Sequence, residues 1–578
     1  MRFLIAWVSP LLSFKETTIY PLVKRLLFRL PLWRRCRSIR TIAALFLIAT
    51  TPTLSPAATD DLFDLLDPNR LAQLNRPLLP RDDVRLVRLS LQDCIHRALQ
   101  YSLDVRISSY DPAIQMADVI QAEAAFDAVL FGSAFWEHSE EGNPNSGFFT
   151  DSVTTPGGVV TRRRPTRAVV QQQEYNYELG LRKRLPTGAT LQTSQLLRRF
   201  RGDSDTALFF DPFYEFTFDV TLQQPLLRDF GLDVNRATIN AARNNFAISK
   251  LQFQLQVITT VVQIEQVYWQ LVQARQQYLI FRDLLQRAQI DRQRQAMRQD
   301  FDAKSTVLAR SSATVSSFKA SLVSSRNAVL QSQDQLLRLL NDPQLDITQR
   351  WEILTLTLPT DRYYTVDLSE AIGIAMQIRP EILAQKLQLD TIDLLVGVSK
   401  NQVLPRLDLV FQQQINGPGR DVSESLEAQQ DLDSITYLGG FNFEVPLGGN
   451  RAARADLQAA RHQQIQEALR LQQTRTDIKA QVSIAASELQ SRWEELNARR
   501  LAAMEEANTF LSYQAQENAD AVITPEFLTL KIDTLLRLAS AQVNLASALA
   551  GYNVSIVAMH QAQGVLLRYN NIKLAELP

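Results

Sequence analysis

Two long stretches of this chain contain neither glycine nor proline, and their apolar residues recur at helical spacing. One runs from Leu232 to Asp342 and the other from Arg451 to Thr524. Average usage of the two residue types, about 12% together, would place roughly thirteen in the first stretch. Helix interiors exclude both, because glycine costs backbone entropy and proline breaks the hydrogen-bond ladder. Each stretch is too long for one globular helix, so the pattern predicts a hairpin of very long helices or a coiled coil.

The first stretch carries two neighbouring apolar lines, each with alternating spacings of four and three residues. The first line is Leu251, Leu255, Ile258, Val262, Trp269 and Val272, interrupted by Glu265, and the second is Val257, Val261, Ile264, Tyr268 and Leu271. A two-stranded coiled coil needs only one such line per helix. Two adjacent lines therefore predict a helix that packs against a neighbour on each side, with Trp269 in the core. A helix over 232–297 would be roughly 100 Å long.

Between the helical stretches the period changes to two, which predicts strands with one apolar and one polar side. The six predicted strands cover about 128–137, 173–184, 189–199, 213–223, 406–415 and 437–445. One-sided strands of this length fit either a sandwich or an outer-membrane barrel with lipid outside and water inside. The turn at 185–188 is tight, whereas the links 138–172, 200–212 and 416–436 are long and polar, and this alternation favours the barrel. Phe135 and Trp136 are then either interfacial aromatic residues or a packed strand end.

The chain also repeats itself, since Leu91–Leu99 matches Leu368–Met376 in its order of apolar and polar positions. We therefore expect two structural repeats, the first at 86–343 and the second at 344–566. The first would hold helices 89–126 and 232–340 around strands within 128–223. The second would hold helices 367–403 and 450–563 around strands within 406–445. Each repeat would start with a short helix capped by Ser90 or Asp367.

The N-terminal residues 1–57 predict a secretory signal peptide. They contain nine Lys/Arg and one acid, followed by an uncharged apolar segment over 41–49 and small residues before position 58. A membrane anchor or a wrongly assigned start codon are the alternatives. Residues 58–85 would form an extended N-terminal segment and 567–578 a C-terminal tail. No other segment is long and apolar enough for a membrane helix, so the rest of the chain would meet a membrane by strands.

Charge and composition exclude several function classes. The whole chain has 61 basic and 61 acidic residues, and residues 58–578 keep 52 and 60 of them, which is a poor balance for binding a nucleic-acid backbone. Two cysteines and four scattered histidines give no disulfide framework and no metal site. Cys94 and His96 are interpreted as ordinary packing or surface residues. No phosphate-binding loop or catalytic grouping is present, so the sequence predicts no cofactor and no enzyme.

Several segments together resemble the TolC family of outer-membrane efflux proteins, over nearly all of 86–566. They are Leu89–Leu99, Ala122–Asp127 leading into a strand, Val445–Arg451 opening a helix, and Leu336–Pro343 ending one. The resemblance implies a mainly helical protein with a membrane β-barrel portion: a homotrimeric α-helical barrel in the periplasm continued by an outer-membrane β-barrel. A typical member contributes four strands per chain, whereas six are predicted here. The extra hairpin around 186–188 leaves twelve or eighteen strands per trimer, or a hairpin that folds over the mouth.

The resemblance also implies a gate and a docking site where the long helices turn back, near 299–305 and 517–525. Asp300, Asp302 and Asp520 are the predicted gate residues, either as threefold acidic rings or simply as exposed acids. The predicted contacts for a periplasmic membrane-fusion adaptor are Phe301, Ala303, Val307, Leu308, Ala309, Thr524, Glu526, Phe527 and Leu528.

The function that follows is an exit channel of a tripartite efflux or type I secretion system, driven by an inner-membrane transporter. The second hypothesis is a periplasmic coiled-coil adaptor or scaffold with a soluble β-domain. A secreted hydrolase has no supporting group of residues.

Overall fold

The structure is a computed structural model that describes residues 76–78, 85–143, 148–165, 168–202, 212–297, 305–432, 434–519 and 524–574. All described residues belong to one compact unit, Thr59–Pro578. The predicted signal peptide, residues 1–57, therefore lies outside the described residues.

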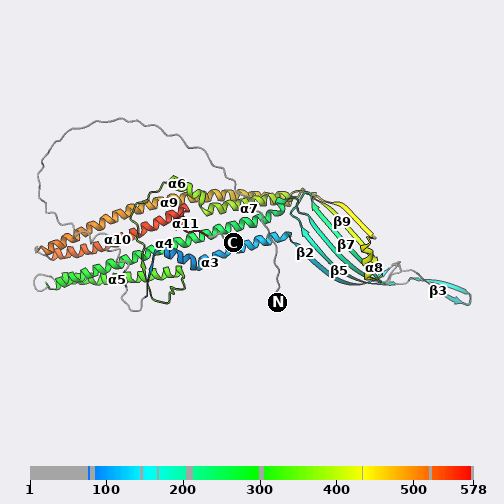
Figure 1. Ribbon diagram of the computed structural model, residues 1–578, viewed down its shortest axis with the longest axis horizontal. Coiled ribbons are helices and arrows are strands. Elements are labelled where there is room, and N and C mark those ends of the chain that lie inside the picture. Colours follow the sequence, from blue (N-terminus) through cyan, green and yellow to red (C-terminus); the bar gives the residue numbers. More distant parts are fainter. Residues whose placement is uncertain are drawn as a thin grey trace, which may run out of the picture. The chain divides into compact units, whose positions relative to one another are not determined.

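Long helices make up most of the described chain, which confirms the mainly helical prediction (Figure 1). In chain order the helices are α2 (Leu91–Tyr101), α3 (Leu103–Glu123), the 3-10 turn η3 (Ala124–Phe126), α4 (Leu232–Met297), α5 (Ser305–Leu340), α6 (Leu368–Ile378), α7 (Pro380–Gln402), α8 (Val422–Gln430), α9 (Arg451–Asn518), α10 (Pro525–Gln563) and α11 (Leu566–Tyr569). The 66 residues of α4 span roughly 100 Å at 1.5 Å per residue.

The short helices begin at the predicted caps. Ser90 and Asp93 form a capping box at the start of α2, and the Asp367 carboxylate accepts the N–H groups of Ser369 and Glu370 at the start of α6. These contacts satisfy backbone donors that have no partner inside the helix, so the chain enters both helices at defined residues.

All six predicted strands are present in one antiparallel sheet (Figure 1). Its strands are β2 (Ala128–Asn143), β5 (Ala168–Arg184), β6 (Thr190–Gly202), β7 (Phe213–Pro225), β9 (Arg406–Gly419) and β10 (Ser434–Glu444). Their order across the sheet is β10-β9-β7-β6-β5-β2, so β10 and β2 form the two edges. The hairpin through residues 186–188 belongs to the sheet, which agrees with the six-strand alternative of the sequence analysis.

Two of the links expected to be long polar loops carry further structure. A separate hairpin of β3 (Phe148–Thr155) and β4 (Gly158–Pro165) lies within 138–172, and α8 lies within 416–436. A parallel pair, β1 (Arg85–Leu89) with β8 (Trp351–Thr355), was also not predicted. These segments have five to nine residues each, which is too short for a clear period of their own.

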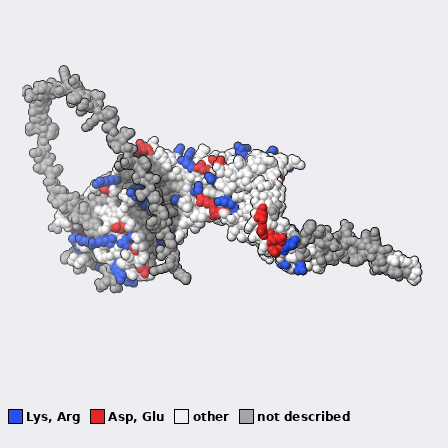
Figure 2. Space-filling model, turned by 45° about the vertical axis from the view of Figure 1, so that its right-hand side comes forward, with Lys and Arg blue, Asp and Glu red and all other residues white. Residues whose placement is uncertain are grey.

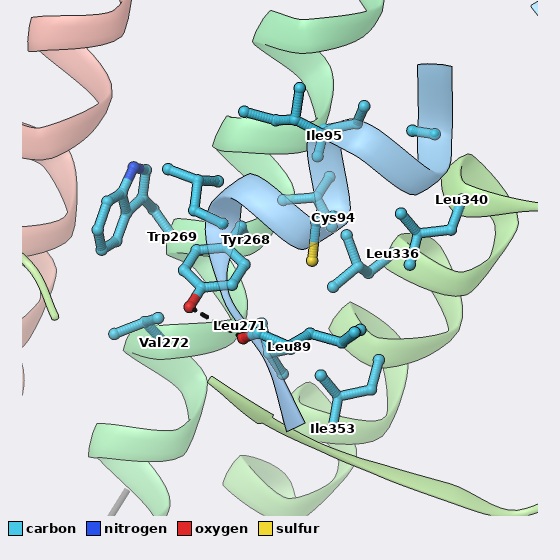
Figure 3. Packing of buried hydrophobic residues seen from close by; sticks show 14 of the residues in the cluster. Leu89, Cys94, Ile95, Tyr268, Trp269, Leu271, Val272, Leu336, Leu340 and Ile353 are labelled. Atoms are coloured by element: carbon cyan, nitrogen blue, oxygen red, sulfur yellow. Dashed lines mark hydrogen bonds between the residues drawn. The ribbon is translucent and has the colours of Figure 1, made fainter. Parts of the chain in front are cut away.

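The main core lies where α2, α4 and α5 meet the β1–β8 pair (Figure 3). Both apolar lines of α4 are buried there over 257–272, and the Tyr268 hydroxyl reaches the Leu89 carbonyl at 3.5 Å. Trp269 is buried, as predicted, and packs edge-on against Tyr268. Two lines are buried because α4 contacts α3 and α7 over its first half and α5 and α10 further along.

A fully buried ion pair fastens the β1–β8 region to α4. Arg275 Nη1 lies 3.2 Å from Glu352 Oε1 and donates to the Ile353 carbonyl, while Nη2 donates to the Arg76 carbonyl at 3.0 Å. Glu352 in turn accepts the Leu78 N–H. Buried charges need such satisfied surroundings, and here they hold residues 76–78 against the helices.

Candidate functional site

The six-stranded sheet has one apolar and one polar face, because residues directly opposite in an antiparallel pair share a face. Leu197 pairs with Phe216 and Leu181 with Leu130, whereas Glu178 pairs with Ser133. Following the register across the sheet gives the apolar face as Leu130, Trp136, Tyr175, Tyr177, Leu179, Leu181, Leu191, Leu197, Tyr214, Phe216, Phe218, Val220, Leu222, Phe411, Ile415, Tyr437, Phe441 and Phe443. The polar face includes Glu174, Glu178, Glu215, Asp219, Gln412 and Gln414.

Much of the apolar face is open to solvent in the single chain. Trp136 is 63% exposed, Phe441 67% and Phe443 68%, and Tyr177 and Leu179 are also exposed. Figure 2 shows a broad area without charged side chains over the sheet, with acidic and basic groups gathered toward its outer end. An exposed apolar patch of this size marks a protein or membrane interaction surface. Phe135 lies on the opposite face from Trp136, because neighbouring strand residues point to opposite sides.

Helix α8 covers the outer part of the apolar face over β7 and β9. The Ser425 hydroxyl accepts the Phe216 N–H at 2.8 Å and donates to the Gly417 carbonyl, so it is inserted between the two strands. Gln429 accepts a hydrogen bond from Gln195 on β6. A Cβ at Gly417 would lie 2.2 Å from the Ser425 carbonyl oxygen, so only glycine admits the helix this closely.

The helices near the sheet form a row with two open edges. α3 contacts α4, α4 contacts α7, and α7 contacts α9, which leaves α3 and α9 at the ends of the row. The outer side of α3 exposes Leu103, Ile107, Tyr110 and Ile114 at spacings of four, three and four residues. α9 exposes Ile465, Leu469 and Ile484. Each edge thus presents apolar side chains at helical spacing that the chain itself does not cover.

The open edges of the helices continue into the open edges of the sheet. α3 leads through η3 into β2 at one edge, and β10 leads into α9 at the other. At the junction, the Asp229 N–H donates to Asn401 Oδ1, and Arg184 Nη2 donates to Asn235 Oδ1 at 2.8 Å. These contacts join the sheet to α4 and α7. The row of helices and the sheet therefore have their unpaired sides in the same two places along the chain.

A buried charged group lies near the ends of the long helices that are remote from the sheet. The Lys531 ammonium in α10 lies 2.9 Å from Asp291 Oδ1 in α4 and 2.5 Å from Glu517 Oε2 in α9, and its side chain is only 4% exposed. Arg294 adds a longer contact to Glu517 at 4.0 Å. We name the set of Lys531, Asp291 and Glu517 the tip cluster. It ties three helices together within two turns of the predicted reversal points.

The predicted gate and part of the predicted docking residues lie outside the described residues. Asp300, Asp302, Asp520, Phe301 and Ala303 belong to this group. α4 ends at Met297 and α5 starts at Ser305, and α9 ends at Asn518 before α10 starts at Pro525, so the chain reverses in both intervals.

The described docking residues differ in their accessibility. Thr524 is exposed and caps α10, its hydroxyl accepting the Phe527 N–H at 3.2 Å. Phe527 packs edge-on against Tyr513 and stays half-buried. The exposed or half-buried set is Leu308, Ala309, Thr524, Glu526 and Phe527.

Val307 and Leu528 do not fit the predicted contact surface. Both side chains are buried against the chain's own helices, with 4% and 5% of their surface exposed. Their helical spacing places them on the inner side of α5 and α10, where they pack within the hairpins.

Burial shifts the pKa of three further groups in the described residues. Burial raises the pKa of Glu265 to about 7, against the hydrogen bond that its carboxylate accepts from Asn570 at 2.8 Å. Burial also raises the pKa of Cys94 to about 12 and lowers that of His560 to about 4. In the same part of the chain, no three His, Cys, Asp or Glu side chains stand close enough to hold a metal ion. Cys94 is a core residue and His96 a surface residue, as interpreted from the sequence.

The sequence could not have revealed the tip cluster or the seat of α8. Lys531 is 240 residues from Asp291, so no spacing links them.

In the described part of the chain, no helix has both the length and the apolar character needed to cross a membrane.

Comparison with known proteins identifies the fold. No family model matches the sequence, and no curated protein matches it. Solved structures do match: the CmeC outer membrane channel of Campylobacter jejuni has 14% sequence identity and a TM-score of 0.56, covering 82% of this chain and 86% of that one. VceC of Vibrio cholerae, an outer membrane protein, has 15% identity and a TM-score of 0.57 over 82% of this chain and 96% of that one. The open state of the MtrE outer membrane channel of Neisseria gonorrhoeae has 15% identity and a TM-score of 0.57, over 82% and 89%. The chain therefore has the fold of the TolC-family outer-membrane channels.

Proposed function

We propose that this protein is the outer-membrane exit channel of a tripartite efflux or type I secretion system, a passive duct and not an enzyme. The observation that carries the proposal is the pair of open sides that run without interruption from α3 into β2 and from β10 into α9. Each side leaves both strand hydrogen-bonding groups and apolar helix residues uncovered, and a sheet edge of this kind needs a partner. A second copy supplies one.

Successive copies pair head to tail, with the β10–α9 side of one against the α3–β2 side of the next. β2 runs away from the helices and β10 returns to them, so the new strand pair is antiparallel like the other five. A heterologous contact of this type forms a closed ring when its rotation closes. The resemblance to the TolC family supports three copies, and hence eighteen strands with six from each chain.

In this ring the two faces of the sheet meet different surroundings. The apolar face, with its exposed aromatic residues, meets the lipid of a bacterial outer membrane, and the polar face lines a water-filled passage. The helices continue this passage into the periplasm. The similar order of elements in the two halves, a capped 11-residue helix, a longer helix and then a strand, supports two structural repeats per chain.

The periplasmic end is proposed to hold an iris-like gate and the docking site of a periplasmic membrane-fusion adaptor, through which an inner-membrane transporter supplies the energy. The tip cluster supports the gate, since it locks α4, α9 and α10 together close to both reversals. Asp300, Asp302 and Asp520 are proposed as the constriction. Leu308, Ala309, Thr524, Glu526 and Phe527, together with Phe301 and Ala303, are proposed as the adaptor surface.

Extraction and conductance test the channel. The protein is expected to require detergent, to migrate as a trimer and to conduct ions in planar bilayers. Release into buffer as a monomer without conductance would instead support the periplasmic scaffold with a soluble β-domain.

Site-directed photo-cross-linking tests the docking site independently. A cross-linker at Thr524 or Ala309 is expected to capture the adaptor in cells. The control position is Ser487, which is exposed on α9 about 45 Å from the helix end by its distance along the axis. Equal capture from Ser487, or none from Thr524 and Ala309, would reject the docking assignment.

A further inference from the structure

The apolar face of the sheet changes character in steps toward its outer end. Lys183 lies opposite Ala128 at the end next to the helices, and the following rows of β2 and β5 are apolar, such as Leu130 opposite Leu181. Further out, Trp136, Tyr175, Arg199 and Tyr214 lie opposite one another in a single row across four strands. The next row on the same face is His138, Gln173 and Arg201. Such an order of aliphatic, aromatic and cationic rows is what a membrane boundary produces on a protein surface.

Arg199 is held in the aromatic row without a charged partner among the described residues. Its guanidinium carbon lies 5.4 Å from the centroid of the Tyr175 ring and 5.8 Å from that of the Tyr214 ring. Its Nε is buried and has no hydrogen-bond partner in the described chain. Two cation–π contacts stabilise the position of the guanidinium, but they do not neutralise its charge.

Arg198, the neighbour of Arg199 in the chain, has acidic partners on the polar face of the sheet. Arg198 donates to Glu174 at 2.8 Å and lies 4.0 Å from Glu215. No ion pair of this kind is formed by Arg199 or Arg201 with the described residues. The charge of Arg199 therefore has no carboxylate beside it among the described residues, and an external anion would supply the missing counter-charge.

The residues around Arg199 indicate which kind of molecule would carry that anion. α8 covers the same face over β7 and β9, where Gln429 meets Gln195, so the open surface beside Arg199 lies over β5 and β2. Over β2 and β5 the acid of this face is Glu140, which accepts a hydrogen bond from Gln171 beyond the His138 row, whereas the acids of α8, such as Glu424, lie over β7 and β9. Below Arg199 the open surface is apolar through Leu197, Leu179 and Leu181. From Tyr175 to Leu181 the strand extends about 20 Å, which at a tilt near 40° is a height of about 15 Å and fits within the apolar band of about 25 Å of an outer-membrane barrel.

We propose that Arg199, with Arg201 beside it, binds the phosphate group of a membrane lipid in the outer leaflet, whose acyl chains lie over Leu179, Leu181 and Leu197. The inference rests on the proposed function, since it requires this face to meet the outer membrane. A guanidinium binds a phosphate through two parallel hydrogen bonds. A phosphate-free lipid lacks the group that accepts them, and in a zwitterionic lipid a positive charge competes with the guanidinium for the phosphate. Arg201 extends the cationic surface toward the water, and the tyrosine rings keep Arg199 at the level of the headgroups. The lipid class of the bacterial outer leaflet with this chemistry is a phosphorylated glycolipid.

The test uses the full trimer in detergent, titrated with lipid A and followed by native mass spectrometry. Wild-type protein is expected to bind lipid A about tenfold or more tightly than dephosphorylated lipid A, and R199Q is expected to lose about tenfold in affinity. R201Q should lose less, because Arg201 is exposed. R182Q is the matched control: it removes the same charge from the neighbouring strand β5, but from the polar face, where Arg182 pairs with Gln192. Its affinity for lipid A is expected to stay within about twofold of wild type, since charges on opposite faces of a sheet are separated.

The outcomes separate this inference from the proposed function. A chain that leaves the cell in buffer or forms no trimer contradicts the channel itself. A conducting trimer in which R199Q and R201Q bind lipid A as wild type does, or in which dephosphorylated lipid A binds equally well, overturns only the lipid site. Displacement of lipid A by millimolar inorganic phosphate would assign the arginines to a free anion and also overturn the proposal. If R199Q fails to form trimers, R201Q and the dephosphorylated lipid still decide the question.

Discussion

Replacing Lys531 by methionine should loosen the end of the helical hairpins at which the gate is proposed. The ammonium lies 2.9 Å from Asp291 and 2.5 Å from Glu517, so the two acceptor oxygens are no further apart than the sum of these distances. The acids are 15% and 12% exposed, and K531M leaves both in a site with little water. Methionine is similar in length to lysine, so packing changes less than charge.

The magnitude follows from the separation of the carboxylates. Two unit charges about 5 Å apart repel by about 3 kcal/mol at an effective dielectric constant near 20. This agrees with the roughly 3–5 kcal/mol measured when one partner of a buried ion pair is removed. Since about 1.4 kcal/mol is a factor of ten, local opening of the α9–α10 end should increase about a hundredfold.

Hydrogen exchange of the purified protein measures this opening directly, in peptides covering the end of α9 and the first turns of α10. R310Q is the control, because Arg310 and Asp533 form a comparable link between α5 and α10 whose side chains are 47% and 32% exposed. An exposed pair contributes about 1 kcal/mol or less, so exchange should rise less than about tenfold. The combination of K531M with D291N and E517Q should restore most of the protection, since no charge is left uncompensated.

Two results would refute the reasoning. Exchange in K531M that stays within the range of R310Q would show that the tip cluster does not hold the helices together. Exchange in the triple variant as fast as in K531M would show that shape, and not charge, is responsible. In the channel, the same loosening should raise the basal conductance of K531M in planar bilayers relative to R310Q.

Three further predictions concern other parts of the chain. Burial raises the pKa of Glu265 from 4.5 to about 7, so the protonated carboxyl stabilises the fold fully below about pH 4.5, and this stabilisation is lost as the pH rises through 7. The loss is worth about 3 kcal/mol in the free energy of unfolding. E265Q should remove this pH dependence from thermal unfolding. Cys94, whose pKa burial raises to about 12, should resist maleimide in the native protein and react only after denaturation. Labelling of the folded protein would contradict its place in the core. S425A should leave the Phe216 N–H unpaired at a cost of about 1–3 kcal/mol and make α8 a site of proteolysis. G417A should increase the proteolysis of α8 more strongly, because its Cβ would meet the Ser425 carbonyl oxygen. Unchanged protease resistance in both variants would show that α8 is held by other contacts.

The elements with a strong period could be predicted from sequence, and those without one could not. The alternation over 213–223 placed Tyr214 and Phe216 on one face and Glu215 on the other, as the strand register confirms. The double apolar line of α4 predicted two packed sides, because burial on each side demands its own line of large residues. Both patterns are local consequences of helix and strand geometry, so a single sequence contains them.

The charged and polar features of the candidate site depend instead on contacts between distant segments. Arg198 and Arg199 are adjacent and chemically identical, yet the register gives one two carboxylates and the other two tyrosine rings. α8 has nine residues and no long apolar stripe, and its position depends on two glycines of β9 that leave room for it. Side-chain chemistry at such positions follows from pairing, which a sequence pattern does not specify.

The widths of the two layers give an independent argument for keeping all six strands in the proposed ring. Six strands about 4.8 Å apart and tilted by about 40° occupy an arc of about 38 Å per copy. The row α3, α4, α7 and α9, at about 9–10 Å between axes, occupies about 36–40 Å. Four strands would occupy only about 25 Å, and the helices would then have to converge sharply where α3 continues into β2 and β10 into α9. Because each open side is one continuous chain segment, the number of copies that closes the sheets must also close the helices. Equal arcs allow both closures without strain at the junction, so the β5–β6 hairpin widens the sheet to match the helices and need not fold over the mouth.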